Sequence, residues 1–168
     1  AADEFLQTLN TDWAILRPSL IYGKNGASTR MFMLLSHMPL LMLPGGGKQI
    51  VQPVHINDVA QAVVSLLAPG TTSPPLRRII EVVGTDSVTI AGLISSYRIQ
   101  RGSKAPWIVA MPALMLNTMA WFGDRIPALP VGSDTLTMLA AGSSGNGDSF
   151  VKLLGRTPLS YREFLHEQ

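Results

Sequence analysis

The chain has 168 residues, of which 46% are hydrophobic and only 14% are charged, and its formal net charge is +2. This length is typical of a single domain that can bury a hydrophobic core. The basic residues are scattered along the sequence, so we expect no nucleic-acid partner. The absence of cysteine excludes disulfides and cysteine-ligated zinc, and fits a reducing compartment.

The first part of the chain predicts alternating helices and strands. Helical spacing of apolar residues predicts a helix over 2–9, and the apolar run 13–16 predicts a strand buried on both faces of a parallel sheet. The Met-rich run 30–41 predicts a helix that ends at or before Pro39, because proline lacks the backbone donor that a helix needs.

Gly45–Gly47 could form either a turn or a phosphate-binding loop. A phosphate-binding loop is followed by a helix, whereas 48–52 has the composition of a strand, so we expect a turn. Further along, Asn57 predicts the N-cap of a helix over 58–67, with Asp58 at the positive end of the helix dipole.

The middle of the chain continues the alternation. We expect a surface loop over 69–75, a buried strand over 79–83, and a helix that begins after the N-cap Thr89 and runs to about Arg101. Strands that alternate with helices in this way predict an α/β architecture.

The last third is less regular. The segment 106–122 has no charged residue, but it is interrupted by Pro112 and falls short of the roughly 20 apolar residues that a membrane span needs, so we expect no transmembrane helix. The composition of 143–148 predicts a loop. Ser160 and Glu163 have the spacing of a capping box that would begin a terminal helix.

Few residues are candidates for catalysis. His55 could be a general base, but its place just before a predicted N-cap favours a structural role. Tyr97 and Arg101 have the spacing of a Tyr-x-x-x-Lys pair, yet arginine holds its proton too firmly to relay it, so we expect ordinary helix-surface residues. His37 and His166 have no partners at metal-binding spacing. We therefore expect no catalytic residue and no metal site.

Two segments, WAILRPSLIYG at 13–23 and QPVHINDVA at 52–60, resemble the middle of the extended and atypical short-chain dehydrogenases/reductases, which include NAD-dependent epimerases and dehydratases. LLGRTP at 153–158 is similar to the closing segment of that family. The family's glycine-rich dinucleotide loop and Tyr-x-x-x-Lys pair do not occur in this sequence. The resemblance implies the C-terminal half of a Rossmann-like NAD(P)-binding fold, with 1–68 as the end of the Rossmann core and 69–168 as a small substrate-side α/β region.

The resemblance also implies roles for individual residues. Pro18 and Ser19 would contact the nicotinamide end of NAD or NADP, mostly through backbone, and Tyr22 and Gly23 would open the substrate side. For Arg17 we expect a structural ion pair or a loop anchor. Leu20 stands where the epimerase branch has a substrate-binding asparagine, so the chain looks more like the atypical branch that includes a respiratory complex I accessory subunit.

Three functions follow as hypotheses. The parent protein would be an NAD(P)-dependent oxidoreductase or epimerase with an unidentified small-molecule substrate, a dinucleotide-binding structural or assembly factor of a respiratory membrane complex, or a self-sufficient interaction domain. We expect this chain alone to show no turnover and weak or no dinucleotide binding, because the pyrophosphate-binding loop is lacking. Its high hydrophobic and low charged fractions predict exposed apolar faces. These faces would contact the missing half of the parent protein, a second copy of the chain or a membrane. The expected location is cytoplasmic, with a peripheral membrane position as the alternative.

Overall fold

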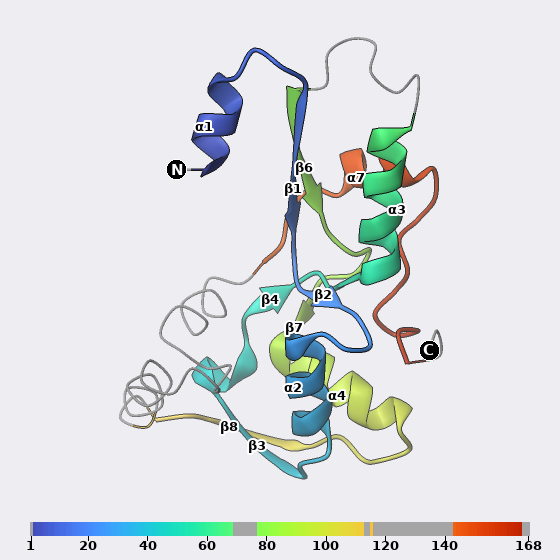
Figure 1. Cartoon of the computed structure of the whole chain (residues 1–168). Helices are drawn as coiled ribbons and strands as arrows, with labels where there is room; N and C mark the ends of the chain where they lie inside the picture. Colours follow the sequence, from blue (N-terminus) through green and yellow to red (C-terminus); the bar gives the residue numbers. More distant parts are fainter. Residues whose placement is uncertain (1, 69–76, 113–114, 116–142, 166–168) are drawn as a thin grey trace.

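The computed structural model describes residues 2–68, 77–112, 115 and 143–165 (Figure 1). Helices alternate with strands, which confirms the predicted α/β class. In chain order the elements are α1 (Ala2–Thr8), β1 (Trp13–Pro18), β2 (Ile21–Tyr22), α2 (Ala27–Ser36), β3 (Leu40–Leu43), the 3-10 turn η1 (Pro44–Gly47), β4 (Ile50–Val51), β5 (Val54–His55), α3 (Ile56–Leu67), β6 (Arg77–Val82), β7 (Val88–Thr89), α4 (Ile90–Gln100), β8 (Trp107–Ala110) and α7 (Asp148–Leu154).

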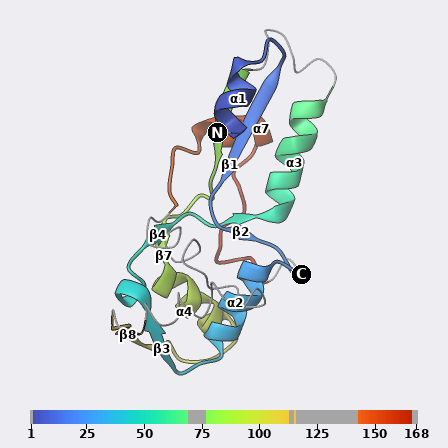
Figure 2. The same ribbon diagram turned by 60° about the vertical axis from the view of Figure 1, so that its left-hand side comes forward.

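One end of the molecule is built on the parallel pair β1–β6, whose register runs from Trp13 opposite Arg77 to Pro18 opposite Val82. Figures 1 and 2 show this pair beside α1 and α3, while α7 packs against both β6 and α3. The apolar residues between these elements form a first core, which consists of Val54, Ala62, Ile80, Val82, Phe150 and Leu154.

The other end of the molecule is built on α2, α4 and the parallel pair β3–β8 (Figure 1). A second core lies there, and it also takes in two aromatic residues from the end of the described chain. Its buried members are Tyr22, Phe32, Leu41, Leu43, Val51, Ile90, Leu93, Ile94, Tyr97, Tyr161 and Phe164.

Two short strand pairs join these ends. β2 pairs in parallel with β5, and β4 pairs antiparallel with β7. Residues before and after position 68 contribute to both cores. The predicted division into 1–68 and 69–168 therefore stays a prediction about the parent fold, and the cores do not follow it.

Several local predictions are confirmed. α2 ends at Ser36, before Pro39. Gly45, Gly46 and Gly47 have φ of 55°, 69° and 66°, values that glycine adopts without strain, and they make the predicted turn. The Thr89 side chain caps α4 by accepting a hydrogen bond of 3.0 Å from the Gly92 N–H.

Three local predictions are wrong. β1 is not buried on both faces, because only Ile15 is buried and β6 is its only strand neighbour in the described part of the chain. α3 begins at Ile56, two residues before the predicted start, and is capped by His55 rather than Asn57. The Ser160 hydroxyl donates to Asp86 over 2.7 Å and accepts from the Arg162 N–H over 3.4 Å, but the described residues 161–165 form a turn rather than the predicted helix.

Other predictions fall wholly or largely outside the described residues. The predicted loop 69–75 lies there, as does most of 106–122, of which 107–110 is strand β8. Among the described helices none is long and apolar enough to cross a membrane.

Gly84 provides a test of the packing between the strand pairs. It is buried, its N–H donates to the Gln52 carbonyl over 3.2 Å, and a Cβ there would overlap the Pro53 carbonyl oxygen. We expect Gly84→Ala to lower the free energy of unfolding by about 3 kcal/mol, because backbone must move to admit the methyl group.

Gly102→Ala is the matched control, since position 102 has a φ of 78° but no atom near the added Cβ. Its expected loss is about 1 kcal/mol, from backbone strain alone. Urea unfolding followed by circular dichroism measures both values, and equal losses would contradict the packing described.

Candidate functional site

The carboxyl ends of β1 and β6 form the edge at which the family resemblance implies a ligand contact. Just beyond β1, the Ser19 N–H donates to the Val82 carbonyl over 3.0 Å, which continues the pairing of the two strands. The Ser19 hydroxyl donates to the Ser143 carbonyl over 2.7 Å and accepts from the Gln52 N–H over 3.3 Å. Ser19 is therefore a structural junction between three segments.

A loop over 143–147 crosses this edge. Its Asn146 N–H donates to the Glu81 carboxylate over 2.6 Å, and its Gly145 N–H donates to the Gln52 side-chain oxygen over 2.7 Å. Beside the loop lies a small, mostly polar hollow of about 140 Å³. Its lining consists of Arg17, Pro18, Glu81, Val83, Ser143, Ser144 and Gly145.

This placement bears on the two predicted cofactor contacts. Pro18 is exposed and lines the hollow, at the carboxyl end of a parallel strand where open α/β sheets bind ligands. The N–H and hydroxyl of Ser19 are already hydrogen-bonded, so a ligand would have to use its carbonyl or displace a bond. Contact of either residue with NAD(P) stays a prediction.

The predicted substrate-side residues lie on the second core. The Tyr22 ring is 4% exposed and stacks on Phe164 with centroids 4.8 Å apart. The Gly23 N–H donates to the Thr29 hydroxyl over 3.1 Å, and its carbonyl accepts from Gly26. The backbone of this turn, rather than the tyrosine ring, is the part that a substrate could reach.

His55 has the structural role that its sequence position favoured. Its buried ring accepts a hydrogen bond from the Asn57 N–H through Nδ1 over 3.3 Å, and so caps α3. The same ring packs against Tyr22 and Phe164, with centroid distances of 5.7 Å and 5.4 Å.

The prediction that Tyr97 lies on a helix surface is wrong. Tyr97 is buried in the second core, and this burial, with a smaller contribution from Tyr22, raises the pKa of the Tyr97 phenol far above its ordinary value. The phenol therefore stays protonated and cannot serve as a base. Arg101 is exposed, as predicted, and its guanidinium lies 3.0 Å from His37 Nδ1.

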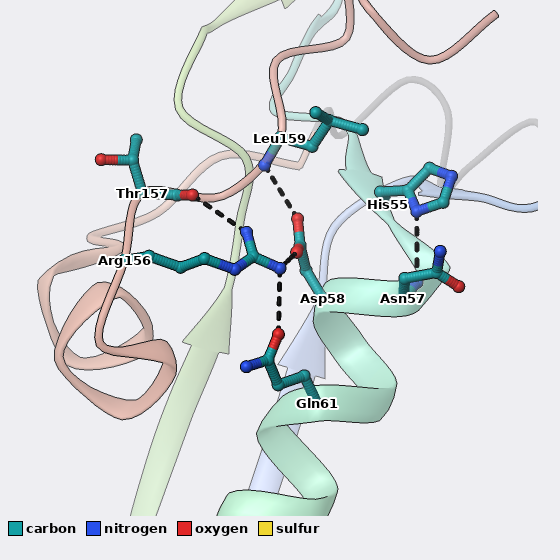
Figure 3. A network of polar contacts seen from close by, with 7 residues as sticks. All are labelled: His55, Asn57, Asp58, Gln61, Arg156, Thr157 and Leu159. Atoms are coloured by element: carbon teal, nitrogen blue, oxygen red, sulfur yellow. Dashed lines mark hydrogen bonds and ion pairs between the residues drawn. The ribbon is translucent and has the colours of Figure 1, made fainter. Parts of the chain in front are cut away.

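The buried carboxylate of Asp58 joins two of the sequence segments that carried the family resemblance (Figure 3). One oxygen accepts a hydrogen bond from Arg156, and the other accepts from the Leu159 N–H over 2.9 Å. Arg156 also donates to the Gln61 side chain over 3.0 Å and to the Thr157 carbonyl over 3.1 Å. Segments 52–60 and 153–158 are thus in direct contact. This contact could not be predicted from the sequence, in which the two segments are about 100 residues apart.

Two further features of the site are the ion pair of Arg17 and the grouping of possible metal ligands. Arg17 makes the expected ion pair, with Asp3 at 3.1 Å, and both side chains are about half exposed. Within the described ranges, no three His, Asp or Glu side chains gather into a group that could hold a metal ion. The described site thus offers a binding edge and structural anchors.

The Asp58 ion pair and the Arg17–Asp3 pair make a matched test. Arg156→Ala leaves a carboxylate at 2% side-chain exposure without its charged partner. We expect a loss of about 2–3 kcal/mol in unfolding free energy, below the full value for a buried pair because Arg156 itself is half exposed.

The control, Asp3→Asn, should cost less than about 0.5 kcal/mol, since water screens an exposed pair. Chemical denaturation of both variants at one salt concentration measures the difference. A smaller effect from Arg156→Ala than from Asp3→Asn would show that the Asp58 network does not stabilise the fold.

No protein-family model matches the sequence, and no curated protein matches it either. Solved structures do match. A nucleoside-diphosphate-sugar epimerase from Staphylococcus aureus is 20% identical, with a TM-score of 0.71 over 98% of this chain and 55% of its own length. A UDP-glucuronic acid 4-epimerase from Bacillus cereus, solved with UDP-glucuronic acid and NAD, is 18% identical, with a TM-score of 0.58 over 91% of this chain and 42% of its own.

A human epimerase family protein solved with NADPH is 14% identical, with a TM-score of 0.63 over 92% of this chain and 48% of its own length. The chain therefore spans about half the length of these proteins. The likeness confirms the predicted fold: this chain has a mixed α/β structure with parallel strands that resembles part of the Rossmann-like fold of NAD-dependent epimerases and dehydratases.

Proposed function

We propose that the chain is the substrate-side half of an NAD(P)-dependent oxidoreductase or epimerase-like protein of the short-chain dehydrogenase/reductase kind. The observation that carries this proposal is the polar hollow at the carboxyl ends of β1 and β6, in a fold like that of about half of an epimerase. In open parallel sheets this edge is where ligands bind.

The residues at this edge fit the nicotinamide end of a dinucleotide. The Glu81 carboxylate and nearby backbone carbonyls can accept hydrogen bonds from a carboxamide, and Pro18 offers an apolar surface to a ring. A bound nicotinamide would supply hydride-transfer chemistry. The chain itself supplies orientation only, because its sequence has no Tyr-x-x-x-Lys pair to move a proton.

The alternative is a dinucleotide-binding structural or assembly factor of a respiratory membrane complex. One observation favours it: Leu20, which occupies the position of the epimerases' substrate-binding asparagine by the sequence resemblance, packs against the second core. A leucine in this setting cannot hydrogen-bond a sugar. Both functions use the edge at the carboxyl ends of β1 and β6, which we call the nicotinamide edge. They differ in whether the parent protein turns over a substrate.

The nicotinamide edge can be tested with a half-cofactor. We expect nicotinamide mononucleotide to bind with a dissociation constant of roughly 1 mM or weaker, and to shift the amide NMR signals of Ser19, Gly84 and Gly145. Adenosine monophosphate is the control and should leave these signals unmoved, since the adenine end would bind outside this chain.

Two results would contradict the proposal. One is a set of shifts confined to residues remote from this edge. The other is a calorimetric dissociation constant in the low micromolar range for intact NAD or NADP, because such affinity needs a pyrophosphate-binding loop.

We also propose that the chain self-associates through the open edge of β1. An apolar hollow of about 400 Å³ lies there between β1 and α3, lined by Asp12, Trp13, Ala14, Leu16, Val63, Leu66 and Leu67. The buried indole N–H of Trp13 has no hydrogen-bond partner in the described structure. An unpaired strand edge beside an apolar hollow favours pairing with another chain.

Sedimentation velocity at micromolar concentration tests this association. The unmodified chain should sediment as a dimer or larger, and Leu67→Lys should return it to a monomer, because Leu67 is 78% exposed at the hollow. Leu34→Lys on α2, at 68% exposure, is the matched control and should stay associated. A clean monomer of the unmodified chain that binds no hydrophobic dye would contradict the proposal.

A further inference from the structure

The parallel ribbon β3–β8 has an apolar outer face. Leu41 and Leu43 of β3 are buried in the second core, so the alternating residues Leu40 and Met42 point away from it. Leu40 stands opposite Trp107 of β8, and Met42 stands opposite Val109. Cross-strand partners share a face, and we call these four residues the ribbon face.

The ribbon face is exposed: Trp107 is 80% exposed and Leu40 is 54% exposed. Met38, which precedes β3, adds another exposed apolar side chain. Purely parallel strands occur almost always with both faces covered, and a solvated sheet face normally carries polar residues. The ribbon face has the composition of a covered surface, and so needs an occupant.

The described segments that build the ribbon and its two helices carry charge of one sign. The stretches 27–51 and 88–110, which contribute α2, α4 and the ribbon to this end of the molecule, contain Arg30, Lys48, Arg98, Arg101 and Lys104 but no Asp or Glu. The acidic residues flank these stretches in the sequence, with Asp12 and Asp58 around the first. Within the described part of the chain, the ribbon, α2 and α4 therefore carry positive charges only.

Some of these cations are fixed beside the ribbon face. The Arg98 guanidinium donates to the His37 carbonyl over 2.9 Å and to the Lys104 carbonyl over 2.6 Å, and so ties together the segments that lead into β3 and β8. The backbone N–H of Trp107 donates to the Pro39 carbonyl, where the same two segments meet. Arg101 and Lys104 are exposed there, close in the chain to Trp107.

We propose that the ribbon face is a lipid-binding surface, which docks the protein peripherally on an anionic bilayer. Trp107, Leu40 and Met42 would enter the headgroup region, while Arg101 and Lys104 contact lipid phosphates. Tryptophan beside aliphatic side chains and a rim of Arg and Lys is the combination that binds membrane interfaces. This surface is separate from the nicotinamide edge and goes beyond the proposed function.

Co-sedimentation with lipid vesicles tests the proposal. We expect binding to phosphatidylcholine vesicles that contain one third phosphatidylglycerol to be at least about tenfold tighter than to pure phosphatidylcholine. The double variant Arg101→Glu/Lys104→Glu should lose about tenfold or more of the binding to anionic vesicles. Trp107→Ser should also lose most of it, because the aromatic anchor is gone.

Two single-residue controls carry changes of the same kind, one charge reversal and one apolar-to-serine change, at the other end of the molecule. Lys152→Glu on α7 and Val64→Ser on α3 change exposed residues and should bind anionic vesicles like the unmodified chain. All substituted residues are exposed, and circular dichroism with a thermal midpoint verifies that each variant is folded.

Three results would overturn the proposal. The first is no binding, or equal binding to neutral and anionic vesicles. The second is an equal loss of binding in the control variants. The third is a dimer in sedimentation that Trp107→Ser dissociates, which would assign the ribbon face to a contact between protein chains.

Discussion

The structure depends most on one buried carboxylate. Asp58 is 1% exposed at the start of α3, and a charge removed from water requires donors around it. Arg156 and the Leu159 N–H supply them, so the end of the described chain is held against α3. From this anchor the chain runs back to α7 in the first core and forward to Tyr161 and Phe164 in the second. A single side chain thus couples the two ends of the molecule.

This anchoring also explains the shape of the candidate site. Because α7 lies against β6, the preceding loop 143–147 is drawn across the carboxyl ends of β1 and β6, where Glu81 and Gln52 hold it. The hollow beside Pro18 is bounded by residues from widely separated parts of the chain. This edge of the β1–β6 pair is therefore a product of tertiary contacts, even though its central segment, 13–23, was recognisable in the sequence.

Local signals were predictable, because their physical causes are local. Pro39 limits α2, Thr89 caps α4, and three glycines turn the chain after β3. What depended on distant partners was not predictable. Tyr97 is buried because distant segments, including α2 and β2, pack in the same core as its helix. The Ser160 hydroxyl donates to Asp86, which lies 74 residues earlier in the chain. The segregation of positive charge around the ribbon face likewise appears only once 27–51 and 88–110 lie together.

Through these contacts, Asp58 should hold the last described segment as firmly as the cores are held. Native-state hydrogen exchange of the Leu159 amide tests it most directly, since this N–H donates to the Asp58 carboxylate. We predict that the amide opens with the same free energy as the buried amides of β6, as expected for one cooperative unit. Exchange at the rate of an exposed amide, while β6 stays protected, would show that Asp58 does not hold this segment in the cooperative unit.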